Sequence, residues 1–136
     1  MKADQTKPQV HVAAALIFKD DRFLACHRTK KKAHGDKWEF VGGKIEKGET
    51  PQEALIRECR EELDIAVRPL SVFAQTTYEY PDISLHFTVF LTEITQGEPK
   101  LLEHDQLAWV RVCDIPNYDF SDADQEIIQK ILQHYS

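Results

Sequence analysis

Runs of apolar and β-branched residues divide most of the chain into strands separated by short polar turns. The stretches that favour strands are 10–18, 22–27, 38–41, 67–80, 84–95 and 106–112. Asp20-Asp21 separates the first two stretches, and Pro81-Asp82 separates the fourth from the fifth. Because such turns join neighbouring antiparallel strands, each pair predicts a β-hairpin.

Two other stretches show the periodicity of an amphipathic helix. Thr50-Pro51-Gln52-Glu53 is a start signal, with Thr50 as N-cap, Pro51 in the first turn and Glu53 closing a capping box. The apolar side of this helix comprises Ala54, Leu55, Cys59 and Leu63. A second helix is expected to begin at Ser121 or Asp122. Its apolar stripe comprises Ile127, Ile128, Ile131, Leu132 and Tyr135. The order strands, helix, strands, helix predicts an α/β fold in which one mixed sheet lies between helices.

Length and charge narrow the class of protein. The 136 residues suit one domain spanning 1–136, and the net charge of −6 disfavours a surface that binds nucleic acid. A nucleotide substrate stays compatible with this charge, because a metal can carry the phosphate contact. Neither a signal peptide nor a membrane span is expected, no required protein partner is implied, and a cytoplasmic location follows. Cys26, Cys59 and Cys113 are predicted to be small buried thiols in a reducing compartment.

The most charged stretch of the chain follows a pair of glycines. On a helix, Glu58, Glu61 and Glu62 lie along one side, one turn apart, where like charges repel. Such a cluster either faces solvent or holds a cation, and the residues alone leave both possibilities open. Gly42-Gly43 lies upstream in a predicted loop, and a glycine pair lets backbone approach a ligand. Since magnesium prefers carboxylates, carbonyls and phosphates, the stretch indicates a cation site that binds a polyphosphate.

The spacing of these residues resembles the signature of the Nudix hydrolases. The residues that carry the resemblance are Gly43, Glu49, Arg57, Glu58, Glu61, Glu62 and Ile65. One position departs from the pattern, because Asp64 stands where the family usually has a glycine that ends the helix in a left-handed conformation. The resemblance implies an α/β/α sandwich with a mixed sheet, in a single Nudix hydrolase domain.

The resemblance also implies an activity and a set of site residues. The activity is hydrolysis of a nucleoside triphosphate to the monophosphate and pyrophosphate with Mg²⁺, for which Mn²⁺ can substitute. The implied metal ligands are a carbonyl of Gly42 or Gly43 and the carboxylates of Glu58, Glu61, Glu62 and Glu103. Arg57 and Glu49 carry over as an orienting salt bridge. Glu58 and Glu61 are included among the catalytic residues, and which glutamate acts as general base stays open.

Further matches extend towards the substrate's base. The run WEFVGGKIEKGET and the late Ser121-Asp122-Ala123-Asp124 resemble the MutT subfamily of nucleotide-pool enzymes. In that subfamily a residue at the start of the last helix binds the purine edge, which here corresponds to Asp124 or to Asp122. Plain helix capping is the alternative for both. Other residues expected to contact substrate, each with a structural alternative, are Arg28, Phe40, Lys44, Tyr80 and Phe87.

Three functions are weighed on this basis. The first is removal of 8-oxo-dGTP from the nucleotide pool, and the second is the same hydrolysis acting on CTP or dCTP. The third is a non-catalytic nucleotide-binding domain of the same fold. Such a domain is expected to lose metal-binding carboxylates, whereas Glu58, Glu61 and Glu62 are all present. An enzyme acting on a small nucleotide is therefore favoured.

Overall fold

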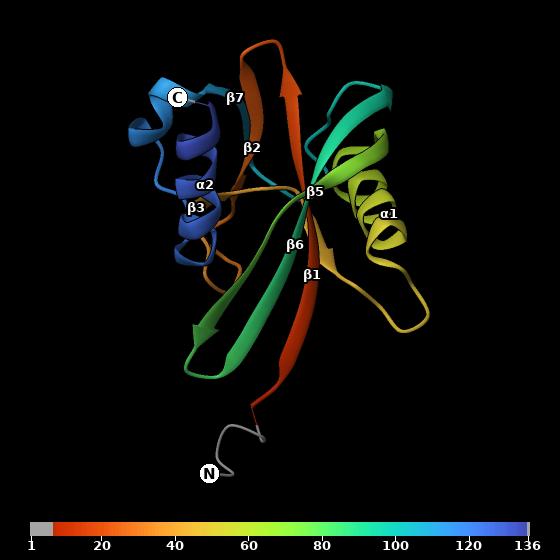
Figure 1. Cartoon of the computed structure of the whole chain (residues 1–136), viewed down its shortest axis with the longest axis vertical. Helices are drawn as coiled ribbons and strands as arrows, with labels where there is room; N and C mark the ends of the chain where they lie inside the picture. Colours follow the sequence, from red (N-terminus) through yellow and green to blue (C-terminus); the bar gives the residue numbers. More distant parts are fainter. Residues whose placement is uncertain (1–6, 136) are drawn as a thin grey trace.

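A mixed β-sheet forms the centre of the protein, whose computed structural model describes residues 7–135 (Figure 1). Its strands are β1 (Gln9–Lys19), β2 (Arg22–Arg28), β3 (Lys37–Glu39), β4 (Gly42–Lys44), β5 (Ala66–Tyr80), β6 (Ile83–Gln96) and β7 (Gln106–Arg111). The order is β3-β2-β1-β6-β5, with β4 paired to β1 and β7 paired to β2. β1 and β6 are parallel and the other pairs are antiparallel, so both predicted hairpins are confirmed.

Two helices cover opposite faces of this sheet, as Figure 1 shows. α1 (Pro51–Leu63) packs on one face and α2 (Gln125–Tyr135) on the other. Alternate residues of β1 serve the two cores: Ala13 and Ala15 face α1, whereas Ala14 and Leu16 face α2. Short 3₁₀ helices, η2 (Val112–Asn117) and η3 (Asp122–Asp124), precede α2. The predicted α/β/α sandwich is confirmed.

The start of α1 is fixed by the predicted capping box. The Thr50 hydroxyl accepts a hydrogen bond from the Glu53 backbone N–H at 3.1 Å. The Glu53 carboxylate accepts one from the Thr50 N–H at 2.9 Å. Pro51 occupies the first turn, where its missing N–H costs nothing. These local bonds set where α1 begins relative to the preceding loop.

The end of α1 shows how aspartate replaces the usual glycine. Asp64 adopts the left-handed conformation, with φ 54° and ψ 45°, and its N–H donates to the Arg60 carbonyl. Its carboxylate lies 3.3 Å from both the Arg60 guanidinium and the Lys100 ammonium. Aspartate tolerates this conformation better than most residues, and the two cations favour it further. The departure from the family pattern therefore leaves the turn intact.

The glycine pair was predicted to lie in a loop, and this prediction is wrong. Gly42 and Gly43 belong to β4 and pair with Ala14 and Ala13 of β1. A Cβ atom on Gly42 would lie 2.1 Å from the Ala13 carbonyl oxygen, so any other residue would push the two strands apart. The glycines therefore serve close strand packing as well as access to the site.

Two smaller predictions also need correction. α2 begins at Gln125, after the 3₁₀ turn η3, because the Ser121 hydroxyl donates to the Asp124 carboxylate at 2.9 Å instead of capping the helix. Cys113 is exposed in η2, whereas Cys26 and Cys59 are buried as predicted. Over residues 7–135, no helix has the length and apolar character needed to span a membrane.

Replacing Thr50 with alanine tests the capping box. We expect Thr50→Ala to lower the free energy of unfolding by about 1 kcal/mol, because it leaves an N–H of the first turn without an acceptor. Urea denaturation followed by circular dichroism measures the change. Thr50→Ser keeps the hydroxyl and should stay close to the parent. Equal stability of the alanine variant and the parent would contradict this role.

Candidate active site

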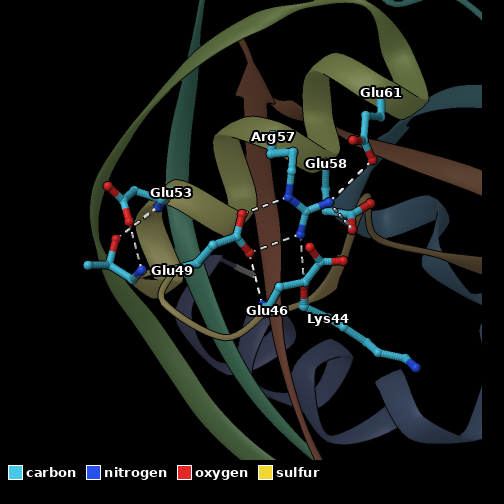
Figure 2. A network of polar contacts seen from close by, with 8 residues as sticks. Lys44, Glu46, Glu49, Glu53, Arg57, Glu58 and Glu61 are labelled. Atoms are coloured by element: carbon cyan, nitrogen blue, oxygen red, sulfur yellow. Dashed lines mark hydrogen bonds and ion pairs between the residues drawn. The ribbon is translucent and has the colours of Figure 1, made fainter.

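Arg57 of α1 joins the helix to the loop and strand before it (Figure 2). Its Nε and Nη2 donate to the two carboxylate oxygens of Glu49 at 2.7 and 3.0 Å. Nη2 also donates to the Lys44 carbonyl at 3.0 Å, and the Glu46 N–H donates to Glu49 at 2.9 Å. These bonds to the guanidinium lower the pKa of Glu49 to about 2. The structure thus contains the predicted salt bridge between loop and helix.

The remaining nitrogen of Arg57 contacts two more glutamates of the signature. Nη1 lies 3.0 Å from Glu58 and 3.2 Å from Glu61. The Glu58 side chain is 14% exposed, whereas that of Glu61 is 58% exposed. Figure 2 shows Glu61 on the outer side of this network. The three acidic residues therefore differ in environment, with Glu61 facing solvent and Glu58 and Glu62 turned inward.

Burial makes two adjacent negative charges costly on the inner side. Burial has the largest effect on Glu62 and raises its pKa. The hydrogen bond with Glu58 and the charges of Glu58 and Glu39 raise this pKa further. A hydrogen bond from the Gly42 backbone opposes the rise. Gly43 makes room for the pair, because a Cβ there would lie 2.4 Å from the Glu58 carboxyl group. Glu58 and Glu62 share a narrow space against β4. Arg57 pairs with Glu58, whereas no ion pair to Glu62 is found among residues 7–135.

The chemistry of this pair suits a hard divalent cation. Carboxylates beside a backbone strand offer the oxygen ligands that magnesium prefers, and added positive charge would let both ionise. In the described part of the chain, no group of three or more His, Cys, Asp or Glu side chains is close enough to hold a metal directly. The donors fit a cation that keeps several waters. Glu58, Glu62 and carbonyls of the glycine pair would hold it.

The structure does not bring Glu103 to this pair. Its carboxylate lies 3.2 Å from the Lys32 ammonium and faces solvent. Lys32 belongs to the loop between β2 and β3, where Lys30, Lys31 and Lys32 are exposed. The predicted metal-binding role of Glu103 therefore has no geometric support in this conformation.

A cleft of about 470 Å³ lies next to Glu62 and reaches the start of α2. The predicted site residues that line it are Arg28, Phe40, Gly42, Gly43, Lys44, Glu62, Tyr80, Phe87 and Asp124. The predicted site residues outside its lining are Glu49, Arg57, Glu58, Glu61 and Glu103. The cleft thus joins the acidic end of the site to residues far along the chain.

Asp124 lies in this cleft and is 4% exposed. Burial raises its pKa to about 7, although the hydrogen bond from Ser121 opposes the rise. Near neutral pH the carboxyl group is therefore populated in both forms, and it can donate or accept a hydrogen bond. Asp122 is exposed and absent from the lining. Of the two predicted base-binding residues, the structure favours Asp124.

Aromatic residues form walls of the cleft. Phe40 is buried and stacks on Phe23 and Phe120, with ring centroids 5.8 Å apart in each case. It belongs to the core and also lines the cleft, so its predicted contact with substrate stays a prediction. Tyr80 stacks on His34 at 4.0 Å, which brings the polar loop after β2 against the β5–β6 hairpin.

The two basic residues predicted to contact substrate, Arg28 and Lys44, differ in the bonds that hold their side chains. Arg28 Nε donates to the Ala33 carbonyl at 2.8 Å, and its Nη1 lies 3.8 Å from Glu39. Lys44 contributes its carbonyl to Arg57, while its side chain points away from that network (Figure 2). The Lys44 ammonium is therefore free of the Arg57 network, although its residue lines the cleft.

Among the other residues that line the cleft are His34, Glu39 and His104, which were not predicted to be site residues. A signal existed for Glu39, because the side chains of a strand alternate. Trp38 and Phe40 face the α2 core, so Glu39 between them must face the other way. His34 and His104 lie in irregular loops, where side chains do not alternate regularly, so the sequence pattern could not predict their direction.

Comparison with known proteins identifies the family. Residues 7–131 match the NUDIX domain. This chain belongs to the NUDIX family. The 8-oxo-dGTP diphosphatase of Escherichia coli is 33% identical, over 90% of this chain and 96% of that protein. The E. coli CTP pyrophosphohydrolase is 28% identical, over 90% of this chain and 91% of that protein.

A solved structure supports the same assignment. The MutT NUDIX hydrolase of Burkholderia pseudomallei superposes with a TM-score of 0.83 at 25% identity, covering 92% of this chain and 99% of that one. NUDIX hydrolases generally need a divalent metal, which agrees with the oxygen-rich pair on α1. The chain is thus a MutT-like member of this hydrolase family.

Alanine substitutions at Gly42 and Gly43 should have different effects, the first on stability and the second on cation affinity. We expect Gly42→Ala to destabilise the fold by about 1–3 kcal/mol, because its Cβ meets the backbone of β1. Gly43→Ala should destabilise the fold less, because the nearest atoms to its Cβ belong to the Glu58 side chain and not to backbone. It should weaken Mn²⁺ binding about tenfold, because it displaces that carboxyl group. Denaturation and Mn²⁺ binding followed by electron paramagnetic resonance measure the two effects. Unchanged Mn²⁺ affinity in a folded Gly43→Ala protein would contradict the role of this position.

The buried carboxyl group of Asp124 should make stability depend on pH. Its ordinary pKa of 3.8 applies to the unfolded chain, and the folded value is about 7. The protonated form therefore favours folding. This contribution is complete below about pH 4 and is lost as the pH rises through about 7. Asp124→Asn should remove this part of the decline, as measured by urea denaturation between pH 4 and 8. The exposed Asp122→Asn variant should keep it, and a parent-like slope in Asp124→Asn would contradict the assignment.

Proposed function

We propose that this protein hydrolyses a nucleoside triphosphate to the monophosphate and pyrophosphate with Mg²⁺, for which Mn²⁺ can substitute. The observation that carries the proposal is the cleft between Glu62 and Asp124. One end offers carboxylates and the glycine pair to a cation and its phosphates. The other offers aromatic walls and a buried hydrogen-bonding group to a base. Membership of the NUDIX family supports the same reaction.

The reaction adds one water across a phosphoric anhydride bond and releases monophosphate, pyrophosphate and a proton. A bound cation would neutralise the phosphate oxygens and make a coordinated water more acidic. Glu58 and Glu62 would hold that cation, and Arg57 keeps Glu58 against β4. Glu61 faces solvent on the same turn, where it can enter the cation's coordination shell. One of these carboxylates accepts the proton of the attacking water.

At the base end, we assign recognition to Asp124. A buried carboxyl group with a pKa near 7 accepts a hydrogen bond from a base N–H when ionised and donates one when protonated. Phe40, Tyr80 and Phe87 contribute the aromatic surface beside it. We take 8-oxo-dGTP as the leading substrate, so that the protein removes an oxidised nucleotide from the precursors of DNA. The relatives named as 8-oxo-dGTP diphosphatases support this choice.

CTP or dCTP is the second candidate. It is favoured by the 28% identity to a CTP pyrophosphohydrolase, which is lower than the identity to the 8-oxo-dGTP diphosphatase of the same organism. A non-catalytic nucleotide-binding domain fits less well, since the signature's acidic residues and their Arg57 network are intact.

Removing the charge of Glu62 tests the proposed site. Glu62→Gln should lower kcat about 100-fold or more, because a metal-binding carboxylate supports several kcal/mol of charge stabilisation in the transition state. Released pyrophosphate, measured with 8-oxo-dGTP, dGTP and CTP as substrates, gives the rates. Glu126→Gln, at an exposed position of α2, should match the parent. A folded Glu62→Gln protein with parental turnover would refute the assignment of the site.

The same assay compares substrates. Parent kcat/KM should be highest for 8-oxo-dGTP, and Asp124→Asn should change the ratio between 8-oxo-dGTP and dGTP. A preference for CTP would keep the reaction and replace the substrate.

A further inference from the structure

Glu39 is a carboxylate of the cleft that lies outside the family signature. It ends β3 and stands opposite Cys26 of β2, so both side chains project from the same face of the sheet. Cys26 belongs to the core beneath α1, which places Glu39 on the α1 side. Glu39 and Glu62 both line the cleft. Two separate elements thus direct carboxylates into the same space.

His104 holds Glu39 in that position. Its Nε2 lies 2.9 Å from a Glu39 carboxylate oxygen, and the histidine is 8% exposed. Because a carboxylate oxygen accepts, Nε2 carries the proton and donates. Within residues 7–135, the other ring nitrogen, Nδ1, is buried without a hydrogen-bond partner. Burying an imidazole with an unpaired nitrogen is unfavourable. The side-chain hydrogen bond that His104 does make orients the Glu39 carboxylate.

The backbone around His104 keeps the imidazole in place. The Leu102 N–H donates to the Glu62 carbonyl at 3.3 Å, and the Asp105 N–H donates to the His27 carbonyl at 3.3 Å. The segment between them therefore bridges the end of α1 and the end of β2. This anchoring places His104 in the lining of the cleft.

We propose that Glu39 is a further carboxylate of the divalent-cation site and that His104 is the residue that positions it. The inference rests on the proposed function, since the cation is the one that Glu58 and Glu62 would hold. Magnesium keeps several waters when protein ligands are few, and those waters need acceptors. Glu39 supplies such an acceptor and one more negative charge from the strand side. Groups that orient the ligands and waters of a metal affect its affinity strongly.

Cation binding without nucleotide tests the role of Glu39. Mn²⁺ titrations of the whole protein, followed by electron paramagnetic resonance, should show about tenfold weaker binding in Glu39→Gln than in the parent. Glu98→Gln, which removes an equal charge from an exposed turn, should bind Mn²⁺ like the parent. Parental affinity in Glu39→Gln would overturn the inference. A change only in the KM for the nucleotide, at parental Mn²⁺ affinity, would also overturn it and assign Glu39 to the base instead.

A pair of His104 variants tests positioning. His104→Gln keeps an N–H that can reach Glu39 and should stay within about threefold of the parent's Mn²⁺ affinity, whereas His104→Leu should bind as weakly as Glu39→Gln. A parental affinity in folded His104→Leu, or an equal loss in both variants, would overturn the positioning role. If His104→Leu fails to fold, Glu39→Gln still decides the main claim, because that carboxylate is partly exposed.

The two proposals fail in distinguishable ways. If the parent binds Mn²⁺ through Glu39 but hydrolyses no nucleotide, the proposed function fails and the cation site stands. If the parent hydrolyses nucleotides and Glu39→Gln binds Mn²⁺ normally, only the further inference fails.

Discussion

The ion pair between Arg57 and Glu49 is the interaction on which the site depends. Its two parallel hydrogen bonds fix the loop before α1 against the helix, and the same guanidinium donates a hydrogen bond to the Lys44 carbonyl of β4. Arginine suits this task because its planar fork binds a carboxylate in a fixed orientation while further N–H groups reach other acceptors. The glycine strand and the acidic helix are thereby held as one unit. The proposed cation site lies between them.

The pKa values of Glu49 and Glu62 are shifted in opposite directions within this unit. Glu49 is held ionised by Arg57, which lowers its pKa, whereas burial and Glu58 raise the pKa of Glu62. The two residues belong to one short stretch, so their environments and not their sequence neighbours decide the difference. A structural salt bridge thus lies next to a carboxylate pair that a bound cation would stabilise. This arrangement suits binding of a metal–phosphate complex, since Arg57 pairs with Glu58 while burial still disfavours the charged form of Glu62.

Most of the fold was predictable because its signals are local. The capping box, the strand patterns and the turns each involve residues within a few positions, and the structure places α1 and the hairpins where these signals predict. The glycine pair was misjudged, because glycine is common in loops and the close approach of β4 to β1 is a long-range contact. The signature's salt bridge was predicted through the family resemblance, and Figure 2 shows it in the structure.

The residues near the proposed base site, and those on the β3 side of the cleft, were harder to predict because they also depend on long-range contacts. Asp124 could be a cap or a base contact until its burial in the cleft was known. His104 meets Glu39 across 65 residues of sequence, and no periodic pattern connects them. Glu103 was predicted to be a metal ligand through the family resemblance, yet its carboxylate pairs with Lys32 from another loop. Contacts between loops depend on the whole fold.

Product analysis on the parent protein tests the central claim most directly. Phosphorus NMR of 8-oxo-dGTP incubated with the protein and Mg²⁺ identifies each phosphate product. The account predicts monophosphate and pyrophosphate in equal amounts, with turnover that stops when a chelator removes the cation. Release of inorganic phosphate with a nucleoside diphosphate, or turnover that continues without a divalent cation, would contradict it.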